Sequence, residues 1–378
     1  MEHRINTTPH TSRITELDLV RAFAMIGVLA VHATSFATID MLKDPASYPV
    51  YNFLNIFMKF GTPVFICLSS LILFMSQYTK PLTTDSLLSF YKKRALHIII
   101  PYLVFSTIYY ISVAVTRTEA EQPARWITDF TLKLATGTAY PHLYFVFVSV
   151  QFYLLYPLVL FLFKKLPQLI PFSIPFGFAV QWGFYKLVQE LDIPHASSWA
   201  FSYFSFYMLG VYAGIRFPVW MARLRRPGGL ALRVAASALW TCWLAAGIGH
   251  SLIWYELRTG IETRPDYVYA LFWNGYTILS ALVFLQAAFF LNRSFREGWL
   301  LRKLEAFGRM SLGIYLVHPL LLAAYRELKP VGASMSTLHL WYAGGFILAL
   351  IGSALIVRFA HSRVPFSWLL FGKNESLA

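Results

Sequence analysis

Runs of about 20 apolar residues, long enough as helices to cross the hydrocarbon core of a bilayer, recur along this 378-residue chain. The composition agrees, because 57% of the residues are hydrophobic and only 13% are charged. Soluble chains carry about 25% charged residues. The sequence therefore predicts an all-α fold, a polytopic integral membrane helical bundle of about ten transmembrane helices. We expect the spans at residues 17–38, 51–78, 96–115, 142–163, 169–188, 199–215, 230–253, 267–291, 310–328 and 338–359.

Lysine and arginine are distributed unevenly between the segments that connect these spans. With the N-terminus in the cytoplasm, 21 of the 32 basic residues fall on the cytoplasmic side and 9 on the outer side, while Arg21 and Lys59 lie within spans. Cytoplasmic loops carry an excess of basic residues, so we expect both termini to be cytoplasmic. The net charge of +14 is then explained by topology and by contact with anionic membrane lipids, and no nucleic-acid partner is expected.

The chain is expected to form one transmembrane domain with short ends. We assign residues 1–16 to a cytoplasmic N-terminal tail, 17–359 to the transmembrane domain and 360–378 to a cytoplasmic C-terminal tail. The first apolar segment is longer than the core of a typical signal peptide, so it is interpreted as the first span. Cys67 and Cys242 lie in apolar segments. Their positions indicate neither a disulfide framework nor a metal site.

Ionisable residues occur inside the first predicted span, which reads LDLVRAFAMIGVLAVHATSF from Leu17 to Phe36. Such groups are costly in a membrane and usually functional. Helical periodicity puts Asp18, Arg21 and His32 on one face. Arginine suits a phosphate or a polarised carbonyl, and neutral histidine is the usual general base near pH 7. The alternatives are that Arg21 extends to the inner interface and that His32 makes a structural hydrogen bond to another helix.

A second polar cluster lies in GRMSLGIYLVHP, from Gly308 to Pro319. Ser311, Tyr315 and His318 are spaced four and three residues apart and therefore share one helix face. The cluster favours a polar site within the bundle. The alternative is helix packing through small residues and interhelical hydrogen bonds.

Two further segments place polar groups at the predicted membrane surfaces. Lys93, Arg94 and His97 lie in FYKKRALHIIIPY, where the chain enters the third span from the cytoplasm. They are either a positive-inside anchor or a mouth that binds phosphate groups. His142 begins the fourth span on the outer side, close to the depth of His32, and is either part of a site or part of an aromatic belt with Tyr140 and Tyr144.

Taken in order, these segments resemble the membrane-bound acyltransferase 3 family. The resemblance covers nearly the whole chain and rests on the Arg21–His32 spacing after LDLV, on GTPVFICLSSLILF at 61–74, on the basic entry to the third span, on HLYF from His142 and on the closing SLGIYLVHP. One departure is that many members carry a second arginine in the basic segment where this chain has His97.

The resemblance implies an enzyme that transfers an acyl group, usually acetyl, from cytoplasmic acyl-CoA to a hydroxyl of an extracytoplasmic surface glycan or lipid-linked sugar. It implies a multi-pass protein of a bacterial plasma or inner membrane, with acyl-CoA as co-substrate and no metal. His32 is then the general base, or the carrier of an acyl-enzyme intermediate. The implied site has catalytic residues His32, Arg21 and Asp18, cofactor-binding residues Arg21, Lys93, Arg94 and His97, and substrate-binding residues His142, Ser311, Tyr315 and His318.

The alternative function is a transporter or flippase of a polysaccharide or lipid precursor, since ten helices with a polar interior also suit transport. The sequence shows no inverted repeat of the kind common in transporters, and one base beside a cationic track favours the enzyme. A receptor-like membrane scaffold is the third class, and it leaves Arg21 and His32 unexplained.

Overall fold

The computed structural model describes residues 14–116, 123–224, 229–295 and 298–372, and every regular element in these ranges is helical. Most of the predicted N-terminal tail, residues 1–13, lies outside the described residues, as do residues 373–378 of the predicted C-terminal tail. The longer helices are α1 (Thr15–Thr34), α3 (Tyr48–Phe57), α4 (Gly61–Gln77), α5 (Thr84–Arg94), α6 (Ile100–Thr116), α7 (Pro123–Thr136), α8 (Tyr144–Lys165), α9 (Ser173–Leu191), α10 (Phe204–Leu224), α11 (Leu230–Thr259), α12 (Asp266–Phe295), α13 (Trp299–Arg309), α14 (Ser311–Arg326), α15 (Met335–Ile347) and α16 (Ser353–Arg363). The shorter ones are α2 (Ala37–Asp40), α17 (Trp368–Phe371), the 3₁₀ helices η2 (Pro167–Phe172), η3 (Ala196–Ser198) and η4 (Ala200–Tyr203), and the π-helical turns η1 (Ala95–Ile99) and η5 (Leu348–Gly352).

The all-helical prediction is confirmed, and the described residues contain seven helical segments long and apolar enough to cross a membrane. An eighth is counted if α13 and α14, which meet at an angle of 79°, form one broken span. The predicted spans at 169–188 and 199–215 correspond to α9 and α10, which are helical but are not among these candidates. These helices indicate a multi-pass membrane protein, while the number ten and the cytoplasmic position of both termini stay predictions.

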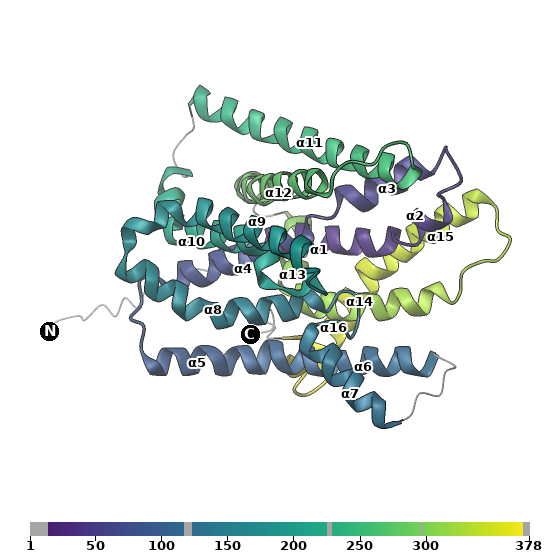
Figure 1. Cartoon of the computed structure of the whole chain (residues 1–378), viewed down its shortest axis with the longest axis horizontal. Helices are drawn as coiled ribbons and strands as arrows, with labels where there is room; N and C mark the ends of the chain where they lie inside the picture. The colour runs from purple at the N-terminus through teal and green to yellow at the C-terminus, as the bar shows by residue number, and fades with distance from the viewer. Residues whose placement is uncertain (1–13, 117–122, 225–228, 296–297, 373–378) are drawn as a thin grey trace.

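Helix α1 lies at the centre of the bundle (Figure 1), packed against α3, α4, α12, α13, α14 and α15. Its packing is close because small residues line the contacts. A Cβ atom at Gly308 of α13 would overlap the backbone oxygen of Asp18. Glycine at this position lets α13 cross the amino-terminal end of α1 directly, and so fixes the surroundings of Asp18 and Arg21.

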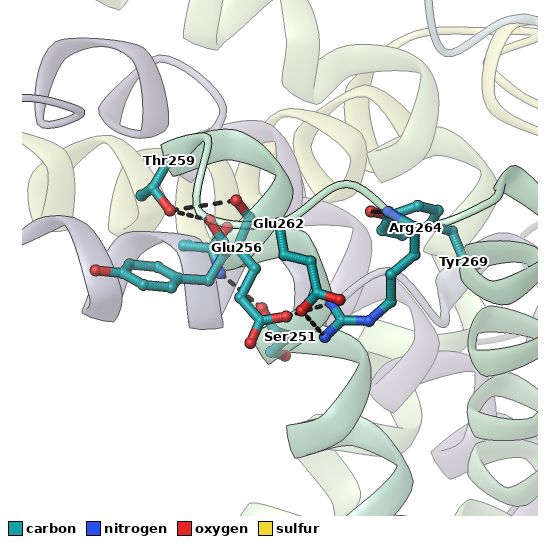
Figure 2. A network of polar contacts seen from close by, with 8 residues as sticks. Ser251, Glu256, Thr259, Glu262, Arg264 and Tyr269 are labelled. Carbon is teal, nitrogen blue, oxygen red and sulfur yellow. Dashed lines mark hydrogen bonds and ion pairs between the residues drawn. The ribbon is translucent and has the colours of Figure 1, made fainter.

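The turn between α11 and α12 is held by a compact polar network (Figure 2). Arg264 donates hydrogen bonds to the carboxylates of Glu256 and Glu262, and its backbone N–H donates to the hydroxyl of Tyr269 at 3.0 Å. Just before this turn, the Arg258 guanidinium donates to the side-chain oxygens of Asn52 and Asn55 on α3. These contacts join α11 and α12, at the top in Figure 1, to the helices around α1.

Candidate active site

Three histidines from separate parts of the chain meet inside the bundle. His32 lies in the last turn of α1, His318 lies within α14, and His142 precedes α8. Their ring centroids are 5.1 Å apart for His32 and His318, 5.8 Å for His142 and His318, and 6.4 Å for His32 and His142. His142 and His318 are almost completely buried. Sequence analysis selected all three residues, and the structure brings them together.

Several ring nitrogens of these histidines have no hydrogen-bond partner within the described residues. Nδ1 of His318 lies 3.0 Å from the carbonyl oxygen of Ile314. Because a carbonyl only accepts, the proton of neutral His318 is assigned to Nδ1, which leaves Nε2 as an acceptor. Within the described residues, Nε2 of His318 and both ring nitrogens of His142 have no hydrogen-bond partner. Buried polar atoms are normally hydrogen-bonded, so the cluster is suited to bind a polar ligand.

The part of the chain that the structure describes contains no group of three or more His, Cys, Asp or Glu side chains positioned to hold a metal ion.

Tyrosines hold the histidine cluster in place. The Tyr315 hydroxyl donates to the carbonyl oxygen of His142, and the Tyr109 hydroxyl donates to the carbonyl oxygen of Leu316 at 2.8 Å. Tyr109 also stacks on Tyr140, with the ring centroids 4.3 Å apart. These contacts tie the segment before α8 to α6 and α14.

Arg326 is a site residue that the sequence analysis counted only as an external basic residue. Its guanidinium donates to the backbone carbonyl oxygen of His32 at 2.7 Å and lies 3.9 Å from the ring centroid of Phe36. The last carbonyls of a helix lack partners within the helix and favour cations. Arg326 therefore anchors the end of α1 that carries His32.

A cavity of about 850 Å³ lies on the His32 side of the cluster, and we call it the outer cavity. Its wall includes His32, Arg326 and Pro319 together with aromatic side chains from α6 and α7. Lys133 and Asp129 of α7 form an ion pair at 2.6 Å on the same wall. This mixture of aromatic and polar groups is suited to a neutral polar ligand.

A second cavity of about 1170 Å³ lies toward the other end of α1, and we call it the inner cavity. Its described lining residues include five lysines and arginines and two histidines but no aspartate or glutamate. The basic residues are Arg21, Lys80, Lys93, Arg94, Arg309, His97 and His361. A cavity with this charge is suited to bind a polyanion.

The basic segment enters this cavity through an irregular helical turn. His97 lies in the π-helical turn η1, between α5 and α6. The Arg94 guanidinium lies 4.6 Å from the ring centroid of Tyr153 and 5.2 Å from that of Phe90. Single π-helical turns occur frequently at functional sites, and this one contains His97, which lines the inner cavity.

The two cavities are separated by one layer of side chains. Tyr315 lines the inner cavity, and its ring centroid lies 5.2 Å from that of His142 and 5.9 Å from that of His318. His32, on the far side of His318, lines the outer cavity. The histidine cluster thus lies between a cavity lined by five lysines and arginines without an acidic residue and one in which Lys133 is paired with Asp129.

The predicted site residues fall into two groups. Arg21, Lys93, Arg94, His97, Ser311 and Tyr315 line the inner cavity. Asp18 is buried and accepts a hydrogen bond from Arg21 at 2.6 Å. His32 lines the outer cavity, with His142 and His318 against it. Met25 and Val28 lie between Arg21 and His32 on α1 and are buried and apolar, so the polar groups do not form a continuous track along this helix.

Comparison with known proteins gives one match. No curated protein and no solved structure shows significant similarity to this chain. The model of a family described as "Acyltransferase domain" matches residues 14–358. This range contains all three histidines and nearly all of the chain. The chain therefore belongs to the acyltransferase 3 family, and acyl transfer is the activity that this membership implies.

Proposed function

We propose that the protein is a membrane-bound O-acyltransferase that moves an acyl group, most simply acetyl, from acyl-CoA to a hydroxyl of a surface glycan or lipid-linked sugar. The donor occupies the inner cavity and the acceptor the outer cavity. The observation that carries this proposal is the position of the histidine cluster between a strongly cationic cavity and a second cavity, lined by His32, whose charged residues include the Lys133–Asp129 ion pair.

The charge of the inner cavity supports acyl-CoA as donor. Coenzyme A carries its phosphates at one end and its reactive thioester at the other, on a thin uncharged arm. Arg21, fixed by Asp18, and Arg94 lie where phosphates are attracted. The positive-inside pattern of the sequence supports a cytoplasmic opening for this cavity, on the side where acyl-CoA is available.

The proposed acyl transfer uses only the imidazole side chains of the histidine cluster. His32 accepts the proton of the acceptor hydroxyl as the oxygen attacks the thioester carbonyl. The carbon–sulfur bond then breaks, and the departing thiolate takes the proton from His32, which returns to its neutral form. His142 and His318 lie against His32 without lining either cavity, and their unpartnered nitrogens in the described structure serve the reacting groups where these enter the cluster. The aromatic wall of the outer cavity supports a sugar as acceptor.

Loss of His32 tests the mechanism. Membrane vesicles with the wild type or with His32→Ala are supplied with radiolabelled acetyl-CoA, and label in the glycan and lipid fractions is measured against the amount of inserted protein. Removal of a general base costs about 10²- to 10⁴-fold in rate, so label transfer by His32→Ala is expected to be barely detectable. Cys242→Ser, an exposed position away from both cavities, is the control and retains its rate. A well-inserted His32→Ala protein with near wild-type transfer rules the mechanism out.

A further inference from the structure

The C-terminal segment 364–372 contributes to the inner cavity. It lies beyond residues 14–358, which the family model matches, and the sequence analysis assigned it to a tail. After α16 ends at Arg363, the chain turns back and forms α17, which packs against α6, η1 and α14. Ser367, Trp368, Phe371 and Gly372 line the inner cavity.

Specific contacts fix this segment to the mouth of the cavity. The Trp368 ring centroid lies 5.3 Å from that of His97, and the Phe371 centroid lies 5.9 Å from that of Phe105. Nδ1 of His361 lies 3.1 Å from the hydroxyl of the buried Ser367. The segment is therefore part of the wall that a ligand of this cavity contacts.

Trp368 is the aromatic group best placed to contact a ligand at this mouth. It is the single tryptophan among the described residues that line the inner cavity. Tyr153 and Phe90 already carry the Arg94 guanidinium on their rings. Tyr315 and Phe145 contact each other at the deep end, with centroids 5.4 Å apart. The remaining aromatic residues of this lining also pack on other rings, Phe65 on Phe145, Tyr156 on Phe90 and Phe371 on Phe105. Trp368 instead lies beside His97 of the basic segment, within reach of a planar group bound there.

We propose that segment 364–372 completes the donor site and that Trp368 stacks on the nucleobase of acyl-CoA. The proposal rests on the assignment of acyl-CoA to the inner cavity. The cations hold the phosphates, and the indole contacts the adenine that adjoins them. Stacking of a base on an aromatic side chain contributes about 1–3 kcal/mol by alanine substitution, which corresponds to at least about fivefold in affinity.

Binding measurements on the purified full-length protein test this assignment. Three probes are titrated by calorimetry: coenzyme A, adenosine 3′,5′-bisphosphate, which keeps base and phosphates, and 4′-phosphopantetheine, which lacks the base. Trp368→Ala is expected to raise the Kd about tenfold for the two probes that carry adenine and to leave the Kd of 4′-phosphopantetheine unchanged. Trp368→Phe keeps an aromatic surface and restores most of the affinity. Val364→Ala, in the same segment but away from the cavity, is the matched control.

Each outcome has a distinct meaning. An unchanged Kd for coenzyme A in Trp368→Ala overturns the stacking assignment and leaves the proposed function intact. Equal weakening of all three probes shows a structural role for Trp368 and also overturns it. A wild-type protein that binds none of the probes removes acyl-CoA from the inner cavity, and both proposals then fail.

Discussion

Arg326 is predicted to position the catalytic helix end without contacting the donor. The guanidinium donates to the carbonyl oxygen of His32 and covers the ring of Phe36, and it lines the outer cavity. Substituting Arg326→Gln removes the charge and shortens the side chain. The carbonyl at the end of α1 then loses its charged partner, and the His32 ring loses its fixed position relative to His318.

The size of the effect follows from the bond that is lost. A hydrogen bond from a charged donor contributes about 1.5–3 kcal/mol. Each 1.36 kcal/mol of barrier is about tenfold in rate, so kcat should fall by about 10- to 150-fold if the whole contribution is lost in the transition state. The KM for acetyl-CoA should stay unchanged, because Arg326 is not among the residues of the inner cavity. Initial rates of label transfer at varied acetyl-CoA concentrations give both constants.

Two further variants make this measurement decisive. Arg326→Lys keeps the charge but lacks the planar fork of guanidinium, so its rate should be intermediate. Lys329→Gln is the control from the same end of α14. Lys329 forms a partly exposed ion pair with Asp40, and such pairs contribute little to stability, so kcat should be unchanged. A kcat for Arg326→Gln within twofold of the wild type, in a protein that is inserted normally, would refute the positioning role.

Two other predictions concern the fold. Gly308→Ala places a methyl group against the backbone oxygen of Asp18 and should destabilise the protein by about 1–3 kcal/mol, which is measured as a lower Tm in detergent. The control Gly275→Ala has open space around the new Cβ atom and should leave the Tm unchanged or slightly raised. Equal Tm values for the two variants would contradict the packing argument. For the orientation, one cysteine at a time is introduced at Ile261 or Leu230, which are exposed near opposite ends of α11, in a Cys242→Ser background that keeps only the buried Cys67. A membrane-impermeant thiol reagent should label intact cells at residue 261 and not at residue 230, and the reverse pattern would place the inner cavity on the outer side of the membrane.

The sequence selected each of the three histidines as a candidate, in part because the depth of a residue in a membrane can be estimated from its position in an apolar segment. His32, His142 and His318 each lie at a definite distance from the end of an apolar segment, and the alternation of spans puts these distances on a common scale. Ionisable residues at such positions are usually functional. Depth linked His142 to His32, whereas His318 was selected because it shares a helix face with Ser311 and Tyr315, and the structure brings the three rings within 6.4 Å of one another.

The depth of a residue in the membrane does not predict which residues of other helices it contacts. Arg326 is separated from His32 by 294 positions, and a sequence does not say which faces of two distant helices meet. The same limit explains Lys80 and Arg309, which entered the sequence analysis only as evidence for orientation and line the inner cavity. It also explains Ser311, which shares a helix face with His318 but lies two turns away and opens on the inner cavity. The sequence analysis did not select Trp368 as a site residue because Trp368 follows the last apolar segment.

The apolar interval on α1 has a consequence for the proposed reaction. Arg21 and His32 are about 16 Å apart along the helix axis at 1.5 Å per residue, and the residues on that face between them are the buried Met25 and Val28. Charged phosphates are stabilised at Arg21 and are strongly disfavoured beyond it, because an unpaired charge in an apolar interior is costly. A neutral arm does not meet this barrier. The arrangement therefore selects a donor whose charge and reactive carbonyl lie at opposite ends of a thin chain. It also keeps the phosphates away from His32, the proposed base.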